Sequence, residues 1–348
     1  MSSHRRPSLG PSLGYVPGEQ PPDAARWIKL NTNESPLPPS PAVAAAVAAA
    51  AGSLRLYPDP QGEPLRSALA RHHGVEPDQV VLGNGADQIL EGCFRAFVDP
   101  GDTVVLSRPT YSLLAVLARL SGARTESVAL DDGGELPPAL AVTPGVMRVL
   151  CNPNSPTGSW APPSEVERCL GDETGSVVVI DEAYCDFAPL SCIPLLPAHE
   201  SWLVVRTFAK SHALAGLRVG YALGGAGLIA DLSAVLESYP VDRLALAGAA
   251  AALDDAVHHR RIVEMVISER ERVRGALRGA GWEVPESHAN FVLGRPPGGD
   301  AAGVAAELRD QQILVRHFPD GDLADRLRIT VGTPEQNDAL LAALAIEG

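Results

Sequence analysis

The chain has 348 residues, of which 45% are hydrophobic and 20% charged, a composition typical of a globular protein with a sizeable core. This length exceeds that of one usual compact core, so we expect two subdomains of unequal size. A formal charge of −14, with no basic cluster longer than short pairs such as Arg260-Arg261, argues against nucleic acid as a partner.

The cysteines and the apolar segments indicate where the protein works. The five cysteines are odd in number, and their spacing matches neither a zinc site nor a disulfide framework. Residues 1–27 contain no apolar core of signal-peptide length, and no later segment reaches the ~18 apolar residues of a membrane span. We therefore expect reduced thiols in a soluble, cytoplasmic protein with no membrane partner.

The first forty residues are rich in proline, glycine and serine, which predicts an extended N-terminal arm over residues 1–40. An alanine-rich helix is predicted to follow. Ser40 is its expected N-cap, Pro41 its first residue, and Gly52 closes it from the C′ position.

From residue 80 onward, short apolar runs alternate with segments of helical length. The runs are QVVLGNG (79–85), DTVVLSRP (102–109), VMRVLCNP (146–153), SVVVIDEAY (176–184) and WLVVRTFAK (202–210). Strands that are apolar throughout are typical of a parallel sheet covered on both faces. Residues 41–240 are therefore predicted to form a large α/β domain with a mostly parallel, open sheet and helices on both faces.

After residue 240 the sequence changes to a charged helical segment at 260–281, strand-like segments at 290–295 and 325–333, and a final helix. The run Thr333-Pro334-Glu335-Gln336 predicts a capping box at the start of that helix. Residues 241–348 are thus predicted to form a smaller α+β domain.

Ligands of open α/β sheets bind at the carboxyl ends of the strands, and five predicted strands end in residues suited to chemistry. The first is followed by Gly83-Asn84-Gly85-Ala86-Asp87 and a helical run, whose N–H groups could hold an anion such as phosphate. A plain strand-to-helix turn is the alternative. The segment does not complete a G-x-G-x-x-G pattern, so it gives little support to a dinucleotide site.

Asp181 and Glu182 follow a run that is too apolar to hold an ionised carboxylate without a partner. A protonated ring nitrogen could be that partner, and Tyr184 could donate to a neighbouring phenolate. A loop cap and a metal-binding aspartate are the alternatives for Asp181. Lys210 ends the next apolar run, and although a single lysine is usually a surface charge, its place among five such strand ends favours a functional role.

These segments together resemble the fold-type I pyridoxal-phosphate aminotransferases, and among them the histidinol-phosphate aminotransferases. The resemblance extends nearly over the whole chain. It rests on YVPGEQPP, KLNTNESPLPPSP, YPDPQGEPLRSALA, GNGADQ, RPTYSLL, NPNSPTG, DEAYCDF, RTFAKSHALAGLRVGY, ANFVLGR, ILVRHF and LRITVGTPEQND, in that order.

The resemblance implies a role for each residue that would contact pyridoxal 5′-phosphate. Lys210 would hold the cofactor as a Schiff base and then move a proton as general acid and base. Asp181 would keep the pyridine nitrogen protonated, Tyr184 would bond the ring 3′ oxygen and Tyr111 would stack on the ring. The cofactor phosphate would be held by Gly85, Ala86, Asp87 and Arg218, with Tyr57 of the neighbouring subunit, so that a homodimer with shared sites is expected.

The resemblance also implies a substrate end. Arg328 would bind the acidic end of the substrate, with Arg316 close to it. Asn33 and Glu34 would belong to an arm that closes over the substrate. For Arg316 a solvated strand residue is the alternative, and for the arm an extended polar segment without a role.

Four positions depart from the family pattern. Ser155 stands where an asparagine usually contacts the ring oxygen, so it is counted among the cofactor-binding residues, with a shorter reach. Ala209 replaces a common phosphate-binding serine, and Leu37 replaces a frequent tyrosine. His212 adds an imidazole near the cofactor end, where a packing role is the alternative to acid-base chemistry. These changes leave the fold and cofactor as expected but weaken the assignment of the substrate.

The predicted function is a transaminase that works by two half-reactions, with histidinol phosphate and 2-oxoglutarate as the leading substrates. Another aromatic or specialised amino acid, or decarboxylation of a phosphorylated amino acid, is the alternative within this class. A cofactor-free binding protein or an aminotransferase-like regulator is the alternative outside it, and the acidic charge disfavours the regulator.

Overall fold

The computed structural model describes residues 4, 17–23, 26–130, 136–171 and 175–346. Most of the first half of the predicted N-terminal arm lies outside the described residues. Within the described part, no helix is long and apolar enough to cross a membrane.

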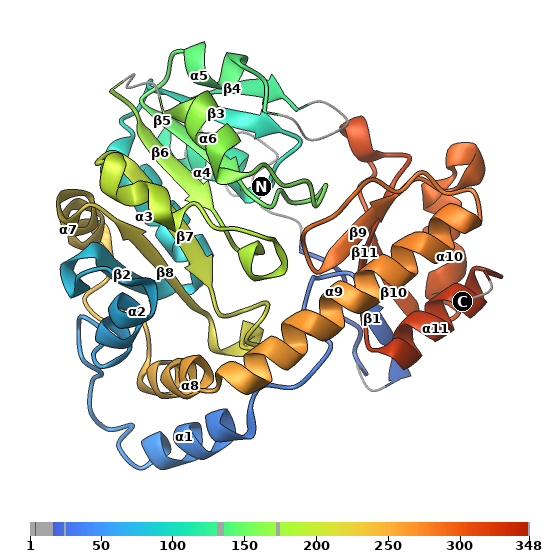
Figure 1. The fold of residues 1–348 in the computed structure, drawn as a ribbon, viewed down its shortest axis with the longest axis horizontal. Helices are drawn as coiled ribbons and strands as arrows, with labels where there is room; N and C mark the ends of the chain where they lie inside the picture. The colour runs from blue at the N-terminus through green and yellow to red at the C-terminus, as the bar shows by residue number, and fades with distance from the viewer. Residues whose placement is uncertain (1–3, 5–16, 24–25, 131–135, 172–174, 347–348) are drawn as a thin grey trace.

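Seven strands form the larger sheet, shown in Figure 1, in the order β2-β8-β7-β6-β5-β3-β4. Their bounds are β2 (Val80–Asn84), β3 (Thr103–Arg108), β4 (Arg124–Ala129), β5 (Met147–Cys151), β6 (Val177–Asp181), β7 (Trp202–Thr207) and β8 (Val219–Gly224). Only β8 runs against its neighbours, β2 and β7; the other pairings are parallel. The mostly parallel sheet predicted from the apolar runs is thereby confirmed.

Alternation along each strand explains why these runs are apolar throughout. In β6, Val178 and Ile180 belong to the core on one face of the sheet, whereas Val179 belongs to the core on the other face. The same division separates Val80 and Leu82 from Val81 in β2. Because successive side chains point to opposite faces, a strand covered on both sides needs apolar residues at every position.

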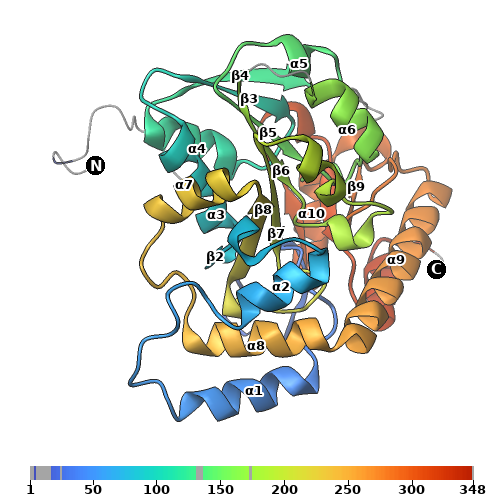
Figure 2. The same ribbon diagram turned by 60° about the vertical axis from the view of Figure 1, so that its left-hand side comes forward.

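Helices supply both covers, as Figure 2 shows from the side. One face packs against α1 (Pro41–Ala51), α2 (Leu65–His73), α5 (Ala139–Val142), α6 (Pro163–Leu170) and α8 (Arg243–Asp254). The other face packs against α3 (Gly85–Phe97), α4 (Leu113–Ser121) and α7 (Ala226–Val235). Short 3₁₀ segments occur at η3 (Pro77–Gln79), η4 (Cys185–Phe187), η5 (Ile193–Ala198), η6 (Ala215–Leu217), η7 (Pro297–Gly299) and η8 (Gly321–Leu323).

A second sheet has four strands in the order β1-β10-β11-β9. They are β1 (Ile28–Leu30), β9 (Phe291–Gly294), β10 (Ile313–His317) and β11 (Leu327–Thr330), packed with α9 (Ala256–Gly279), α10 (Ala301–Asp310) and α11 (Pro334–Ala343). Part of the segment expected to be an extended arm is therefore strand β1, which pairs in parallel with β10. The sequence signal for a strand of only three residues was too short to separate it from the arm.

The two capping predictions at helix starts are confirmed. The Ser40 side chain accepts from the N–H of Ala42, and Thr333 and Gln336 form a reciprocal capping box at α11. Gly52 differs from the prediction, because its φ of −63° is an ordinary right-handed conformation. The turn after α1 therefore does not use the conformational freedom of glycine.

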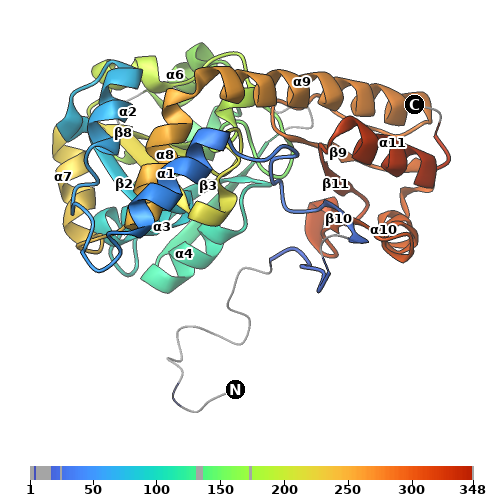
Figure 3. The ribbon, with the colours of Figure 1, turned by 90° about the horizontal axis from the view of Figure 1, so that it is seen from below.

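Helix α9 is a single helix of 24 residues that links the two sheets, as Figure 3 shows from below. Its first half packs with Tyr184 and Phe187 of the larger part, through Ile262 and Val266, and its second half joins the core of the smaller sheet. Helix α8 lies beyond the predicted domain boundary at residue 240 yet contacts α1 and α2. The boundaries at residues 40 and 240 stay predictions.

Candidate active site

A cavity of about 270 Å³ lies where the carboxyl ends of the parallel strands face the smaller sheet. It brings together eleven of the predicted site residues. They are Asn33, Ala86, Asp87, Tyr111, Ser155, Asp181, Tyr184, Lys210, Arg218, Arg316 and Arg328. Residues separated by almost 300 positions in the chain thus line one space.

Lys210 stands three residues after the end of β7. Its Nζ lies 5.5 Å from the centre of the Tyr184 ring, and within the part of the chain that the structure describes it takes part in no hydrogen bond or ion pair. A primary amine at the edge of a cavity and without an ion-pair partner can act as a nucleophile or as a proton carrier.

Asp181, the last residue of β6, is only 6% exposed. Burial raises the pKa of its carboxyl to about 6, although the N–H of Ala183, which donates to Oδ1 at 3.0 Å, acts in the opposite direction. The Cys151 thiol lies 3.7 Å from Oδ2. Such a carboxyl is incompletely compensated by the protein and would be stabilised as a carboxylate by a cationic ligand in the cavity.

The start of α3 is suited to binding an anion. Gly85, its first residue, has a φ of +77°, and a Cβ there would stand 2.7 Å from the guanidinium of Arg218. Gly220 of β8 passes so close that a Cβ would lie 2.4 Å from the backbone nitrogen of Ala86. Glycine is needed at both places, because it lets the helix N-terminus and a guanidinium approach the same point.

The side chain of Asp87 holds two residues beside the start of α3, Arg218 and Tyr111. Asp87 accepts hydrogen bonds from Arg218 Nη2 at 2.9 Å and from the Tyr111 hydroxyl at 3.1 Å. The side chain of Asp87 thereby fixes both residues, while its backbone N–H belongs to the first turn of α3, where no intrahelical acceptor is available.

Asn33 joins the N-terminal segment to the smaller sheet and to the cavity. Its Nδ2 donates to the Tyr184 hydroxyl at 2.9 Å, and its backbone N–H donates to Thr330 Oγ1 at 3.0 Å. The carbonyl of Asn33 accepts from Asn290 Nδ2, also at 3.0 Å. With these bonds Asn33 holds a left-handed backbone, φ 55°, and fixes the hydroxyl of a buried tyrosine.

The opposite end of the cavity is basic. Arg328 donates to Ser155 Oγ at 3.4 Å and to the Asn31 carbonyl at 3.2 Å, whereas Arg316 donates to the Pro17 carbonyl at 3.1 Å. The Ser155 hydroxyl, predicted to contact the cofactor, is therefore also within reach of this basic end. Two guanidiniums at one wall make it suited to a carboxylate or phosphate.

Among the other residues named in the sequence analysis, Tyr57, Glu34 and His212 lie away from the cavity. Tyr57 is 76% exposed and stacks on Tyr239 with ring centres 4.5 Å apart, outside the cavity. Glu34 pairs with Lys29 at 2.6 Å. His212 does not line the cavity and stacks on His259 instead.

Sequence reasoning missed several residues that shape the site. Phe318 lies under both guanidiniums, Thr330 and Asn290 hold Asn33, and Gly220 admits the start of α3. A signal was present for Phe318, because it ends the same run, ILVRHF, that contains Arg316. The others act through contacts across the fold that no local pattern reports.

Comparisons with known proteins agree with this geometry. The family model for aminotransferase class I and II matches residues 25–344. Histidinol-phosphate aminotransferase 2 of Thiobacillus denitrificans is 46% identical over 97% of this chain and 95% of its own, and histidinol-phosphate aminotransferase 1 of Pseudomonas aeruginosa is 44% identical over 99% of both. The crystal structure of histidinol-phosphate aminotransferase from Sinorhizobium meliloti in complex with pyridoxal-5′-phosphate superposes with a TM-score of 0.83 at 30% identity, covering 91% of this chain and 89% of that one.

Proposed function

Because the chain belongs to the class I and II aminotransferase family and is a pyridoxal-phosphate-dependent transaminase, we propose that it moves the amino group of histidinol phosphate to 2-oxoglutarate. The donor is named in the relatives that match nearly the whole chain. The observation on this chain that carries the proposal is the paired basic wall of Arg316 and Arg328, which suits a phosphate dianion.

The cavity fits the phosphate end of pyridoxal phosphate. Gly85, Ala86 and Asp87 would offer N–H groups of the first turn of α3, and Arg218 would supply a positive charge. Because Gly220 has no side chain, strand β8 can lie close to the start of α3 without disturbing this arrangement. Ala209 also lines the cavity, and since it has no hydroxyl, it cannot add the bond that a serine would give.

The cavity also fits the ring. Asp181 would hold the proton on the ring nitrogen, since a cationic nitrogen offsets the burial that raises the pKa of this carboxyl. The Tyr184 hydroxyl, already bonded to Asn33, would donate to the ring oxygen, and Tyr111 would cover one face of the ring. When bound, the cofactor supplies an electron sink for negative charge at the substrate Cα.

Lys210 would do two things in this site. Its amino group would hold the cofactor covalently before substrate arrives. Once released, the same amino group would take the proton from the substrate Cα as general base and deliver it to C4′ of the cofactor as general acid. Its Nζ lies at the Tyr184 ring, beside the place where the cofactor ring would be oriented, so little movement is needed.

Arg328 and Arg316 would bind the phosphate of the donor in one half-reaction and a carboxylate of 2-oxoglutarate in the other. Both anions would use one basic wall because only one occupies the cavity at a time. Arg328 is also held by Ser155 and by the Asn31 carbonyl, so its guanidinium is already oriented before the substrate binds.

A half-reaction screen tests the proposal. The holoenzyme is mixed with histidinol phosphate, histidinol or an aromatic amino acid, without acceptor, and the absorbance of the cofactor is followed. We expect rapid conversion with histidinol phosphate and at least about hundredfold lower kcat/KM without the phosphate, because two charge-assisted contacts are lost. Brisk conversion of an aromatic amino acid with none of histidinol phosphate would replace the proposed donor with the aromatic alternative.

We further propose a homodimer in the cytoplasm. Several large apolar side chains have exposed fractions from 43% to 76%, as expected for a surface covered by a second subunit. They are Leu54, Leu56, Tyr57 and Tyr239. All five cysteines are free and buried, which fits a reducing compartment.

Complementation tests the shared site. If Tyr57 serves the neighbouring site, mixing the inactive Lys210→Ala and Tyr57→Ala proteins under exchange conditions restores part of the activity, because one site of each mixed dimer is intact. A monomer in sedimentation, or no recovery despite proven exchange, would count against the dimer with shared sites.

A further inference from the structure

A cluster of two imidazoles and a carboxylate lies behind the Lys210 segment, outside the cavity. It consists of Asp186 in η4, His212 two residues after Lys210, and His259 near the start of α9. One possible ligand atom from each residue lies within 4.8 Å of the other two. Among the described residues, no other group of three or more histidine, cysteine, aspartate or glutamate side chains has ligand atoms this close together. The proposed transamination does not use this cluster.

The two imidazoles are arranged in a way that leaves ring nitrogens available. The His212 and His259 rings stack with centres 4.1 Å apart and an angle of 14° between their planes. Stacked rings cannot hydrogen-bond each other through their edges, and the buried Nε2 of His259 makes no hydrogen bond.

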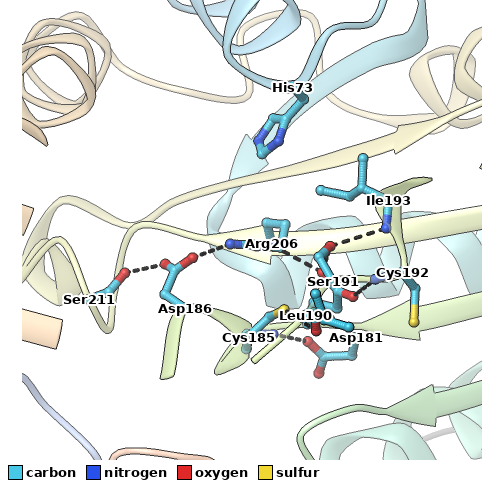
Figure 4. A network of polar contacts seen from close by, with 12 residues as sticks. His73, Asp181, Cys185, Asp186, Leu190, Ser191, Cys192, Ile193, Arg206 and Ser211 are labelled. Carbon is cyan, nitrogen blue, oxygen red and sulfur yellow. Dashed lines mark hydrogen bonds and ion pairs between the residues drawn. The ribbon is translucent and has the colours of Figure 1, made fainter. Parts of the chain in front are cut away.

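The carboxylate of Asp186 is held from two sides, by Arg206 and by Ser211, as Figure 4 shows. One oxygen accepts from Arg206 and the other from Ser211, and the second oxygen lies 3.5 Å from His259 Nε2. These contacts fix the orientation of the Asp186 carboxyl group relative to the two imidazoles.

The positive charge of Arg206 does not exclude a cation from this place. Arg206 Nη1 also donates to the buried carboxylate of Glu182 at 3.0 Å. Two carboxylates, Asp186 and Glu182, thus surround one guanidinium, so the charge of Arg206 is balanced within the cluster. The side chains of Asp186 and His259 are 21% and 26% exposed, so the cluster lies close to the surface.

We propose that Asp186, His212 and His259 form a binding site for a divalent transition-metal ion, with Zn²⁺ as the best match. Two imidazole nitrogens and one carboxylate oxygen are a common ligand set for Zn²⁺. Bonds of about 2 Å in a tetrahedron put ligand atoms about 3.3 Å apart, so the ligand atoms, which lie within 4.8 Å of one another, must move closer and the stacked rings must turn toward the ion when it binds. Water or the Ser211 hydroxyl completes the fourth position.

The site would join three elements that surround the catalytic lysine. Asp186 belongs to the segment that follows Tyr184, His212 to the Lys210 segment, and His259 to the helix that runs to the smaller sheet. A bound ion ties these elements together and stabilises the native protein by mass action. This inference does not depend on the identity of the amino donor.

Zinc titration of the holoenzyme, tag-free and dialysed against a chelator, tests the site. Zn²⁺ is added in competition with a chromophoric indicator, for wild type, His212→Gln, His259→Gln and the control His258→Gln, whose imidazole bonds the Pro38 carbonyl instead. We expect one tight equivalent per chain in wild type and control, and at least about tenfold weaker binding in the other two. Co²⁺ should give the visible absorption of a tetrahedral ion in wild type and lose it in both variants.

Two results would overturn the proposal: no binding of Zn²⁺ to wild type at micromolar concentration, or binding to His212→Gln and His259→Gln that equals the wild type. Folding is checked separately, by the cofactor absorbance and the melting temperature of each variant without metal. Zn²⁺ should then raise the melting temperature of wild type and of His258→Gln but not of the two site variants.

Discussion

Arg316 and Arg328 are directly opposed partners on the neighbouring antiparallel strands β10 and β11, and both guanidiniums lie over the ring of Phe318, at 5.4 and 5.6 Å from its centre. Two like charges side by side repel each other. The aromatic ring and the carbonyls of Pro17 and Asn31 offset part of that repulsion before any anion binds. A doubly charged anion offsets it further.

We therefore expect the loss of kcat/KM on removing each arginine to depend differently on the charge of the substrate. Arg328→Ala should lower kcat/KM for every donor by at least about a hundredfold, because Arg328 is the arginine fixed by Ser155. Arg316→Ala should reduce kcat/KM about tenfold more for histidinol phosphate than for a carboxylate donor. Steady-state kinetics with both donors gives these ratios, with Arg309→Ala, paired with Glu19 at the surface, as control. Equal losses for both donors would contradict the division of roles.

Phe318 is predicted to act on both arginines. Phe318→Leu keeps an apolar contact but removes the aromatic face, which is worth about 0.5–2 kcal/mol per cation. KM should rise several-fold for donor and acceptor alike, with little change in kcat. Unchanged KM for both substrates would show that the ring only packs against the arginines.

Lys210→Ala should leave the fold intact and reduce transamination by at least about a thousandfold, because the covalent link and the proton carrier disappear together. Lys29→Ala removes a lysine that pairs with Glu34 outside the cavity and serves as control. Turnover is measured with the proposed substrates, and cofactor retention by absorbance after borohydride treatment and dialysis. Near-normal turnover of Lys210→Ala would refute its assignment.

Asp181→Asn should separate stability from catalysis. Because the folded pKa of about 6 lies above the ordinary 3.8, Asp181 favours the cofactor-free fold below about pH 4, and this contribution is lost as the pH rises through about 6. At pH 7.5 the cofactor-free Asn variant should be the more stable protein by up to about 3 kcal/mol, with the difference vanishing near pH 4.

The same variant should be nearly inactive with cofactor, since an amide cannot hold the proton on the ring nitrogen. Denaturant unfolding at both pH values and steady-state turnover check the two halves. An Asn variant that is less stable at every pH would mean that Asp181 is satisfied by the protein alone.

Gly220→Ala should weaken cofactor binding, because its Cβ would stand 2.4 Å from the backbone of Gly85 and Ala86 and push the start of α3 away. Gly216→Ala is the matched control, since a Cβ there meets nothing within 4 Å. Titration of the cofactor-free proteins with pyridoxal phosphate should give at least about tenfold weaker binding for Gly220→Ala only. Equal affinity of the two variants would show that the close approach has no bearing on the anion site.

The sequence was informative where local chemistry determines local structure. The apolar runs predicted the strands because β6 and its neighbours are buried on both faces, and Ser40 and Thr333 predicted their helix starts because capping needs only adjacent residues. The reversed direction of β8 has no local signature.

Long-range contacts could not be predicted in the same way. The bond between Asn33 and Thr330 spans 297 positions, and the stacking of His212 on His259 depends on where α9 begins. Gly52, predicted to close α1 from the C′ position, instead has an ordinary right-handed conformation at the C-cap. The family resemblance named eleven residues that line the cavity, but it gave no account of Phe318 or Gly220.

The pairing of β1 with β10 has a consequence for biosynthesis. A ribosome releases Ile28–Leu30 long before Ile313–His317, so the first strand has no partner while most of the chain is made. The seven strands of the larger sheet are complete once residue 224 has emerged, and they can assemble first. The N-terminal segment, and with it Asn33, finds its place only after β10 and β11 have emerged, so catalytic competence has to wait for residues 313–330.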